Sequence, residues 1–543
     1  MSLFEQILIA RGLSGSAASE FLSPDYNKQH DPFLLPDMDK AVERLVKARK
    51  SQDKITIYGD YDIDGLTATT VLLDAFKSFG FNDVEAFIPN RFVEGYGLTV
   101  DAVETIAAQG TKLIVTVDCG SLSHKEIERA NELGVDVIVT DHHNVSDVQP
   151  AAIAVINPKR TDHAYPFIDL AGVGVAFKLV RALQTKLDGL TEGNEKWLLD
   201  LVALGTVCDV VTLKDENRTN VFWGLQVLKK TRRPGLRALM AVAKVEPDTL
   251  NSRSLGFALG PRMNASGRLD TARHALDMLL ARDNITAYER AEQLDTLNIA
   301  RRSDQAAILK EAIIQADQYS DDAVLVVSGA SWNHGIVGIV AAKLLEKYQK
   351  PTYVLQEMGE HAKGSARSYG DFSAVQAIRA ADDLIIKGGG HKLAAGVTMP
   401  TANIQAFRVR VNEFYKSQNL TNQTALLLPK ADVTIDDFAE VTESLIDQLA
   451  SLEPFGSGNP EPILRLENVV VVDQRRMGDD RQHVKLDVKD KRGLRIQALA
   501  FSAPDYFFAE PGEQITILFQ PTLNEWQGRR SVEGRLLHVI RDL

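Results

Sequence analysis

A chain of 543 residues is too long for one hydrophobic core, and its length predicts roughly three or four domains of about 100–200 residues each. It is 45% hydrophobic and 25% charged, as ordinary globular proteins are, and its net charge of −12 argues against a protein that coats nucleic acid through its overall field, although a local basic groove is not excluded. The chain has two cysteines, Cys119 and Cys208, which excludes a disulfide framework and a cysteine-rich zinc site.

Short apolar runs alternate with helical patterns between residues 54 and 160. The runs that predict strands are KITIYGD, VEAFIPN, KLIVTVDCG, VDVIVTDHH and IAVINPK. This alternation predicts an α/β domain, a parallel sheet with helices on both faces. In such sheets functional sites form beyond the carboxyl ends of the strands, and several of these runs end in polar residues there.

The pattern changes after residue 170. Residues 171–280 predict mainly helices, and the polar stretch 282–319 predicts a long exposed helix that connects two domains. A second α/β unit follows, with the glycine-rich stretch GGGHKLAAG. Beyond residue 425 about five short strands are predicted, which suits a small β-barrel such as an OB-fold. The predicted parts of the chain are therefore 1–280, 281–319, 320–424 and 425–543.

Three aspartates, Asp60, Asp62 and Asp64, occupy alternate positions of YGDYDIDG, directly after a predicted buried strand. Like charges this close raise one another's pKa, and burying them unpaired would be costly, so a divalent cation among them is the simplest explanation. A solvated calcium-type loop or a helix-capping turn remains the alternative, because aspartate is a preferred residue in both.

Further acidic and histidine residues follow other predicted elements. Asp118 lies in VDCGS, the run Asp141, His142 and His143 in TDHHN, and Asp209 in the apolar stretch LGTVCDVV. Carboxylates with one or two imidazoles suit Mn²⁺ or Mg²⁺, and such a set can hold two ions that activate water for attack on a phosphate ester. A helix cap at Asp118 and a core or surface pair of histidines remain alternatives. Asp209 is more telling, because a buried unpaired carboxylate is costly.

These stretches carry a family resemblance. The chain resembles the DHH phosphoesterase superfamily, whose motifs I to IV match, in family order, YGDYDIDG, VDCGS, TDHH and LGTVCDVV. GGGHKLAAG (388–396) is similar to the signature of the companion DHHA1 domain. GPRMNASGR (260–268), with LEPFGSGNPEP before the β-rich tail, narrows the resemblance to the bacterial single-strand-specific 5′-to-3′ DNA exonucleases. The resemblance implies a DHH catalytic domain (1–280), a connector helix (281–319), a DHHA1 domain (320–424) and an OB-fold domain (425–543).

The resemblance implies a centre with two ions, Mn²⁺ or Mg²⁺. Asp62 and Asp64 would each hold a different ion, and Asp118 would bridge the two. His142 and Asp209 would complete the shell of the second ion.

Other residues of these motifs would act without binding metal. The resemblance implies that His143 faces the scissile phosphate as a donor to its oxygen or to the leaving group. Asp141 and Asp60 are expected to orient the ligands, because metal-bound histidines usually donate their other N–H to a carboxylate or carbonyl. For Asp60 a purely structural cap is an equal alternative.

Recognition of the DNA end needs different groups. In the family the DHHA1 side recognises the 5′-terminal phosphate, and hydroxyls, a guanidinium and exposed backbone N–H groups suit an anion. The matching residues are Ser365, Arg367, Ser368, Gly389, Gly390 and His391. A flexible turn is the alternative for the glycines. Arg91, Arg262 and Arg268 could add substrate contacts from the catalytic side.

The expected activity is therefore 5′-to-3′ hydrolysis of single-stranded DNA to 5′-mononucleotides, in recombination and repair. A nano-RNase or cyclic-dinucleotide phosphodiesterase of the same superfamily is the closest alternative, but such enzymes lack the β-rich tail. A non-catalytic nucleic-acid-binding scaffold is a further alternative, although every expected ligand position is filled.

The resemblance also bears on partners and location. It implies contacts with single-strand-binding protein and a RecQ-type helicase, a monomeric state, and the absence of an additional C-terminal domain found in some relatives. No apolar run of about 18 residues occurs, and the first residues lack a signal-peptide pattern. We therefore expect a cytoplasmic protein without a membrane partner.

Overall fold

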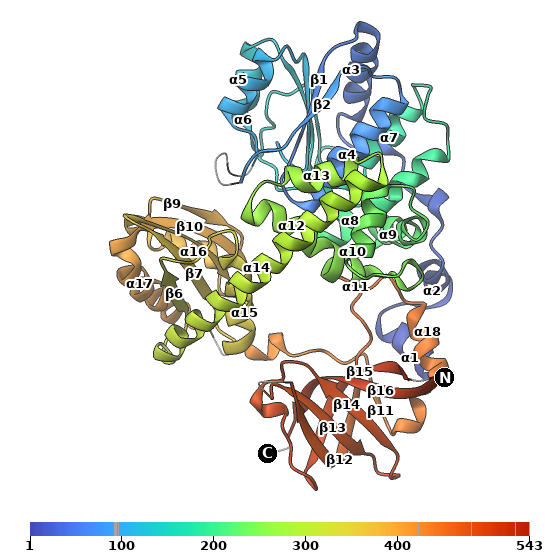
Figure 1. The fold of residues 1–543 in the computed structure, drawn as a ribbon, viewed down its shortest axis with the longest axis vertical. Coiled ribbons are helices and arrows are strands. Elements are labelled where there is room, and N and C mark those ends of the chain that lie inside the picture. Colours follow the sequence, from blue (N-terminus) through green and yellow to red (C-terminus); the bar gives the residue numbers. More distant parts are fainter. Residues whose placement is uncertain (92–94, 96, 421–422, 479–480, 527, 542–543) are drawn as a thin grey trace. The chain divides into compact units, whose positions relative to one another are not determined.

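The computed structural model describes the chain except for residues 92–94, 96, 421–422, 479–480, 527 and 542–543 (Figure 1). It forms two compact units. The one called here the N-terminal unit contains 14–298 and 451–461, and the C-terminal unit contains 1–13, 299–450 and 462–543.

A five-stranded sheet forms the centre of the N-terminal unit. Its order is β2-β1-β3-β4-β5, and every neighbouring pair is parallel, as the alternating pattern predicts. The strands are β1 (Ile55–Gly59), β2 (Val84–Phe87), β3 (Leu113–Val117), β4 (Asp136–Thr140) and β5 (Ala154–Ile156).

Helices cover both faces of this sheet, because successive side chains of each strand point to opposite faces. In β3, Leu113 and Val115 belong to the core shared with α3, α4 and α7, whereas Ile114 belongs to the core shared with α5 and α6. These helices are α3 (Met38–Ser51), α4 (Ile63–Ser78), α5 (Val100–Ala108), α6 (His124–Glu132) and α7 (Gly172–Gln184).

The rest of the N-terminal unit is helical, as predicted for 171–280. Its helices are α2 (Gly15–Leu22), α8 (Leu199–Cys208), α9 (Asp215–Leu228), α10 (Pro234–Val242), α11 (Ser252–Ser254), α12 (Gly260–Leu269) and α13 (Arg273–Leu280). Between α11 and α12 the chain forms one stretch of π-helix, η5 (Leu255–Leu259).

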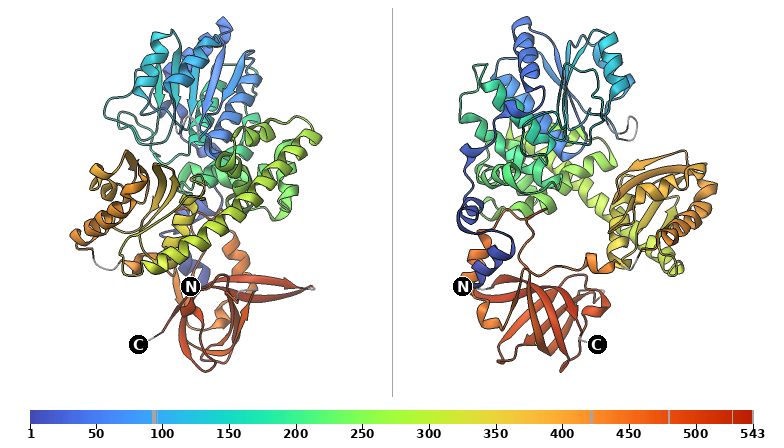
Figure 2. Two further views of the ribbon diagram at one scale, coloured as in Figure 1. Left: turned by 60° about the vertical axis from the view of Figure 1, so that its left-hand side comes forward. Right: turned by 180° about the vertical axis from the view of Figure 1, so that it is seen from behind.

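The predicted connector is the 35-residue helix α14 (Asn284–Gln318), visible in both views of Figure 2. It is not exposed throughout. Ala287, Ala291 and Leu294 are buried in the core of the N-terminal unit. Their helical spacing was hidden in the sequence because two of the three are small alanines within a largely polar stretch.

Residues 451–461 lie in the N-terminal unit although the segments on both sides of them belong to the C-terminal unit. The buried guanidinium of Arg218 donates to the carbonyl oxygens of Leu452, Glu453 and Pro454 at 3.2, 2.8 and 3.4 Å. The Ser252 hydroxyl donates to the Phe455 carbonyl at 2.6 Å. The segment is thus anchored to α9 and α11 by hydrogen bonds to its backbone.

The C-terminal unit contains the second predicted α/β part. Its mixed sheet has the order β6-β7-β8-β10-β9, in which only β6 and β7 are parallel. The elements are β6 (Leu325–Gly329), α15 (Val337–Tyr348), β7 (Thr352–Met358), β8 (His361–Arg367), α16 (Ala374–Arg379), β9 (Lys387–Gly390), β10 (Ala394–Pro400) and α17 (Ile404–Ser417).

The β-rich tail forms the predicted barrel. Strands β12, β13, β14, β16 and β15 pair in this order, and the β12–β15 pairing closes the ring. The elements of this part, with α1 from the N-terminus, are α1 (Leu3–Ala10), β11 (Val433–Ile435), α18 (Glu443–Ala450), β12 (Leu464–Met477), β13 (His483–Lys489), β14 (Arg495–Ala500), β15 (Gln514–Trp526) and β16 (Arg529–Ile540). Among the helices that the structure describes, none is long and apolar enough to cross a membrane.

Candidate metal centre

The register of the parallel sheet brings the polar motifs of the N-terminal unit together. Gly59 of β1, Val117 of β3 and Thr140 of β4 are aligned across three neighbouring strands. The next residue after each of them is an aspartate: Asp60, Asp118 and Asp141. The three motifs therefore meet at the carboxyl edge of the sheet, where sites form in such folds.

Asp62 and Asp64 are positioned by two helix N-termini. Asp62 caps α4, and its Oδ1 accepts hydrogen bonds from the backbone N–H groups of Asp64 and Gly65 at 2.9 and 3.2 Å. Asp64 accepts from Gly172 N–H at 2.6 Å and Val173 N–H at 2.8 Å, at the start of α7. Capping is thus a real function of Asp62, as the alternative proposed, but these bonds occupy only one of its two oxygens.

Two glycines permit the close packing around the aspartates. A Cβ atom on Gly172 would lie 2.7–2.9 Å from side-chain atoms of Asp118, and one on Gly65 would lie 2.5–2.8 Å from backbone atoms of Asp60. Any side chain at either position would push the carboxylates apart.

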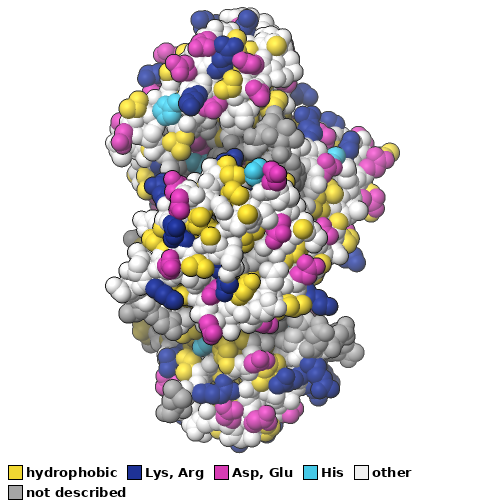
Figure 3. Space-filling view, turned by 90° about the vertical axis from the view of Figure 1, so that its left-hand side faces the viewer, with side chains coloured by type: hydrophobic (Ala, Val, Ile, Leu, Met, Phe, Trp, Pro, Cys, Tyr) yellow, Lys and Arg dark blue, Asp and Glu magenta, His cyan; other side chains and the backbone are white. Residues whose placement is uncertain are grey.

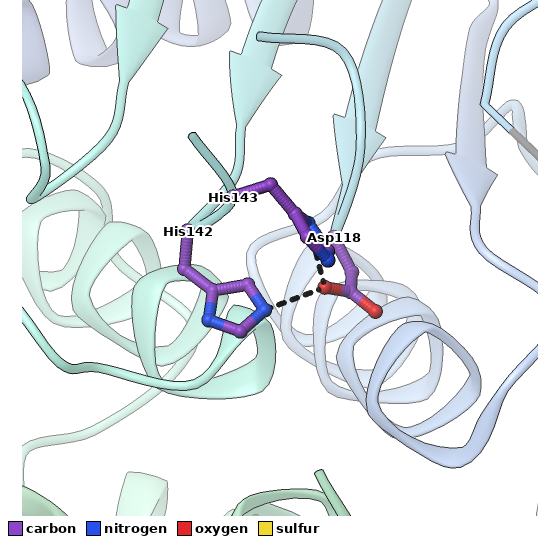
Figure 4. A group of neighbouring side chains, drawn as sticks. All are labelled: Asp118, His142 and His143. Atoms are coloured by element: carbon purple, nitrogen blue, oxygen red, sulfur yellow. Dashed lines mark ion pairs between the residues drawn. The ribbon is translucent and has the colours of Figure 1, made fainter. Parts of the chain in front are cut away.

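His142 and His143 approach Asp118 from the end of β4 (Figure 4). His142 Nε2 lies 3.1 Å from Asp118 Oδ1, and His143 Nδ1 lies 3.7 Å from the same oxygen. His142 Nε2 also lies 3.6 Å from Asp209 Oδ2 and 3.8 Å from Asp64 Oδ2. One imidazole nitrogen therefore faces carboxylates that come from three separate motifs.

The described side chains form two groups without a shared residue that could each hold a metal ion. The ligand atoms within each group lie within 4.8 Å of one another. One group contains Asp64, His142 and Asp209, and the other contains Asp60, Asp62 and Asp118. A third group, of Asp118, His142 and His143, overlaps both.

The protonation states show how strongly the carboxylates repel one another. Burial and the charges of neighbouring aspartates raise the pKa of Asp64 to about 7 and that of Asp209 to about 9. The same causes hold the pKa values of Asp60 and Asp118 well above their usual range. Burial lowers the pKa of His142 to about 3, so its imidazole is neutral at pH 7.

These features fit divalent cations. Within the described part of the chain, Asp60 Oδ1 and His142 Nε2 are buried without a hydrogen-bond partner. A hydrogen bond to the Leu170 backbone orients the His142 ring, and its neutral Nε2 faces carboxyl oxygens, so acceptor meets acceptor unless a proton or a cation lies between them. Oxygen-rich sets with one imidazole suit Mn²⁺ or Mg²⁺.

Asp141 differs from the other aspartates, because it forms an ion pair with His143. Its Oδ1 lies 2.9 Å from His143 Nδ1 and accepts from the backbone N–H groups of His142 and His143. Burial alone would raise the pKa of Asp141, but these hydrogen bonds outweigh burial and lower it. Burial alone would lower the pKa of His143, but Asp141 raises it. Asp141 thus favours the protonated form of the His143 ring and contacts it at Nδ1.

Sequence reasoning did not identify Asn157, the residue that follows β5. Its buried amide donates to the His143 carbonyl at 2.9 Å and to the Ser121 hydroxyl at 2.8 Å. Ser121 N–H in turn donates to Asp141 Oδ2 at 2.9 Å. Asn157 therefore joins three of the loops at the sheet edge. The only signal in the sequence was its position after a strand, in INPK.

The three arginines predicted on the catalytic side have different surroundings. The Arg91 guanidinium lies 5.1 Å from the ring centroid of Tyr61, and both Arg91 and Arg268 act electrostatically on the Tyr61 hydroxyl. Tyr61 stands between Asp60 and Asp62, and Arg91 also acts electrostatically on Asp60, so Arg91 lies near the metal centre. Arg262 instead donates to Asp295 Oδ1 of α14 and to a backbone carbonyl, both at 2.8 Å.

Some of the residues predicted to bind the 5′-phosphate lie together in the C-terminal unit. Gly396 of β10 pairs with Ser365 of β8 on one side and Gly389 of β9 on the other. A Cβ atom on Gly338, in the first turn of α15, would lie 3.3 Å from Arg367 Nη2 and 3.4 Å from Ser365 Oγ. A hydroxyl, a guanidinium and a helix N-terminus thus converge, which is suitable chemistry for an anion. Sequence reasoning did not identify the α15 N-terminus.

The remaining predicted phosphate ligands have contacts of their own. The Ser368 hydroxyl is buried and donates to the Phe372 carbonyl at 2.8 Å. Gly390 has a φ of +137°, and His391 N–H donates to the Ala394 carbonyl, so both shape the β9–β10 turn. The glycine run itself forms strand β9 and pairs with β10, so only Gly390, at the end of the strand, enters the turn that was the alternative for the run.

Family models match three parts of the chain. The DHH family, N-terminal domain, matches residues 54–206, the DHHA1 domain matches 321–417, and the RecJ OB domain matches 432–538.

Named relatives match over most of the chain. The single-stranded-DNA-specific exonuclease RecJ of Bacillus subtilis is 37% identical over 97% of this chain, which spans 66% of that relative's length. The enzyme of the same name from Dickeya dadantii is 35% identical, with 93% of this chain and 91% of the relative covered. A crystal structure of Thermus thermophilus RecJ with Mn²⁺ matches with a TM-score of 0.83 and 29% identity over 99% of this chain and 76% of that one. The same protein with Mg²⁺ matches with a TM-score of 0.78.

A parallel sheet whose carboxyl edge gathers aspartates and histidines for two cations, followed by a DHHA1 domain, defines a metal-dependent phosphoesterase of the DHH type. Within that class, the OB domain and the relatives that match over nearly the full length identify the family. The chain belongs to the family of the single-stranded-DNA-specific exonuclease RecJ.

Proposed function

We infer that the protein is a single-stranded-DNA-specific exonuclease that hydrolyses phosphodiester bonds with two divalent cations, Mn²⁺ or Mg²⁺. The observation that carries this conclusion is the pair of ligand groups without a shared residue at the carboxyl edge of the sheet. Its relatives are named for this activity, and the matching Thermus structures contain Mn²⁺ and Mg²⁺.

The proposed ligands follow the two groups. Asp62 and Asp118, with Asp60, hold one ion, and Asp64, His142 and Asp209 hold the other, while Asp118 lies close enough to His142 to contact both ions. Bound there, the two cations supply Lewis acidity, which lowers the pKa of the attacking water and stabilises charge on the leaving oxygen. Asp60, for which the sequence predicted an orienting role or a structural cap, is here proposed as a ligand instead.

His143 is proposed to face the scissile phosphate. Asp141 binds Nδ1 and raises the pKa of the ring, which favours the imidazolium form, and in that form Nε2 would donate its proton to a phosphate oxygen or to the leaving group. Asp141 acts by orienting the ring, and Asn157 acts on the backbone of the same loop.

The 5′-to-3′ direction is proposed to come from the C-terminal unit. Ser365 and Arg367, with the N-terminus of α15, would bind the 5′-terminal phosphate, and Gly389, Gly390, Ser368 and His391 would shape or line that site. On the catalytic side, Arg91 and Arg268, which flank Tyr61, would contact the strand, with Arg262 beside α14. A bound 5′ end sets the bond that is cut and makes 5′-mononucleotides the product.

Because the net charge of the chain is −12, local groups of Lys and Arg side chains must attract the DNA, rather than the overall electrostatic field. On the face shown in Figure 3, Lys and Arg side chains stand among Asp and Glu side chains. The closed barrel of β12–β16 supports single-stranded DNA as the substrate, because OB-folds bind single strands and because short-substrate enzymes of the superfamily would not need it. The proposal includes a role in recombination and repair in the cytoplasm, a monomeric enzyme, and contacts with single-strand-binding protein and a RecQ-type helicase.

The test is digestion of single-stranded DNA, labelled at either end, in the presence of Mn²⁺. Circular DNA, blunt duplex and a dinucleotide are digested in parallel. We expect mononucleotides from the 5′ end only, with circles and blunt duplex spared. Cleavage of the dinucleotide alone would transfer the chain to the nano-RNase type of activity and overturn the proposal.

Arg367→Ala tests the assignment of the end-binding site. We expect the variant to lose most of the preference for a 5′-phosphorylated over a 5′-hydroxyl end, because a guanidinium–phosphate hydrogen bond is removed, while the rate of hydrolysis at saturating DNA changes little. The measurement is the ratio of kcat/KM values for the two substrates. Arg379→Ala, on α16 of the same unit, is the control. An unchanged ratio for Arg367→Ala would refute the assignment.

A further inference from the structure

An exposed aromatic side chain stands on the π-helical segment η5. Phe257 is 77% exposed, whereas the other exposed aromatic residues among those described in the N-terminal unit, Trp223 and Tyr288, are 39% and 47% exposed. π-Helical turns are rare and occur often at functional sites, because the extra residue per turn reaims the side chains around it.

This segment packs directly against the part of α8 that carries a proposed metal ligand. The Cys208 thiol donates to the Leu255 carbonyl at 3.7 Å, and a Cβ atom on Gly260 would lie 2.7 Å from Cys208 Sγ. A Cβ atom on Gly256 would lie 3.8 Å from Val207 Cγ1. The next residue after Cys208 is Asp209. Phe257 is therefore presented by an element in contact with the rim of the metal centre.

The surroundings of Phe257 suit a nucleobase next to a phosphate. The Arg253 guanidinium lies 5.4 Å from the ring centroid, and its side chain is 55% exposed. Its ion pair with Glu461 is long, at 4.0 Å, so the charge remains available to an anion. On the other side of the packing contact, Val210 is 69% exposed and has a φ of +64°, a strained conformation for a β-branched residue.

We propose that Phe257 and Arg253 form a stacking platform, on which Phe257 stacks against one base of the single-stranded DNA beside the metal centre and Arg253 binds a neighbouring phosphate. This proposal rests on the proposed exonuclease function and adds to it two residues that position the single-stranded DNA. An aromatic face can stack against any base, so the platform would add binding affinity for DNA without a sequence preference.

The test combines protein variants with DNA that lacks single bases. Binding is measured in the non-cleaving Asp118→Asn background, by fluorescence anisotropy on strands that carry one abasic residue at successive positions from the 5′ end. Phe257→Ala is expected to weaken binding of intact DNA by about 5- to 150-fold, the range that corresponds to about 1–3 kcal/mol for base–aromatic stacking. At one abasic position, the protein that retains Phe257 should bind the abasic strand as weakly as Phe257→Ala binds intact DNA. On that same strand, Phe257→Ala should cause no further loss of affinity.

Three variants sharpen the comparison. Phe257→Trp should bind normally, because it keeps a stacking face, and Ile285→Ala, which removes an equally exposed apolar side chain (75%), should bind normally too. Arg253→Ala should lower the slope of log K against log salt by about 1, as the loss of one phosphate contact does.

Several outcomes would overturn the platform. These are normal binding by Phe257→Ala, a loss that is the same at every abasic position, or a fall in the thermal unfolding midpoint, which would show that Phe257 packs within the chain. Failure of the unmodified protein to digest single-stranded DNA would refute the proposed function instead, and the binding comparison would still report on Phe257.

Discussion

At the scale of single residues, Asp118 has properties that a structural cap does not require. Its backbone has a φ of +61°, a left-handed conformation that aspartate and asparagine tolerate better than most residues, and its side chain is almost completely buried. Its Oδ1 is the atom that both histidines approach. A buried carboxyl group on a backbone of this unusual conformation is consistent with strain retained for function.

Asp118→Asn separates a metal ligand from a structural residue. Asparagine keeps the backbone conformation but removes a negative charge, so we expect hydrolysis to fall by more than about 100-fold, since even loss of an outer partner of a ligand costs 10- to 100-fold. Without metal, the variant should be at least as stable as the parent, because one buried like charge is gone. The measurements are initial rates in Mn²⁺ and thermal unfolding in EDTA. Marked destabilisation in EDTA would identify Asp118 as a structural cap.

At the scale of elements, periodicity predicted most of the N-terminal sheet. The runs that predicted strands contain β1 to β5. The motifs that follow these strands lie close together in space because parallel strands align their carboxyl ends. Local pattern could not predict that the α7 N-terminus would bind Asp64, or that η5 would be a π-helix, because both depend on tertiary packing. For the same reason Asn157 had no distinctive spacing.

A partly buried ion pair joins helix α4, which begins beside Asp62, to its neighbours. Asp74, in α4, accepts hydrogen bonds from Arg233 before α10 and from Arg282 before α14, the latter at 3.0 Å. Burial alone would raise the pKa of Asp74, but the two guanidinium groups outweigh burial and lower it. The charged form is therefore the one that stabilises the fold.

Asp74→Asn should destabilise the protein at neutral pH by about 2 kcal/mol, the usual contribution of hydrogen bonds to charged groups. Because the pKa of Asp74 is lower in the folded state, this advantage of the parent is complete above the unfolded-state value of about 3.9 and disappears as the pH falls through the folded-state value. Urea unfolding of both proteins between pH 7 and pH 3 measures it. The exposed Asp248→Asn is the control. A difference that does not change with pH would contradict the ion-pair explanation.

At the scale of the whole molecule, stability should depend on the cation. Repulsion among buried carboxylates opposes folding, and an ion that binds only the folded chain adds about 2.7 kcal/mol at a concentration of 100 times its Kd. We expect removal of metal by EDTA to abolish hydrolysis and lower the unfolding midpoint, and Mn²⁺ to restore both. Differential scanning fluorimetry with titrated Mn²⁺ measures the shift. An equal shift in Asp118→Asn would show that the ion binds elsewhere.

The passage of residues 451–461 through the N-terminal unit limits how the gene can be shortened. A reading frame truncated just after the DHHA1 region would still encode every aspartate and histidine of the motifs. It would nevertheless remove the three carbonyls that accept hydrogen bonds from the buried Arg218, and an unsatisfied buried donor costs about 1–3 kcal/mol. The segment that leads into the barrel is therefore also part of the wall of the catalytic unit. Selection for a well-folded nuclease would retain that segment even where DNA affinity was not under selection.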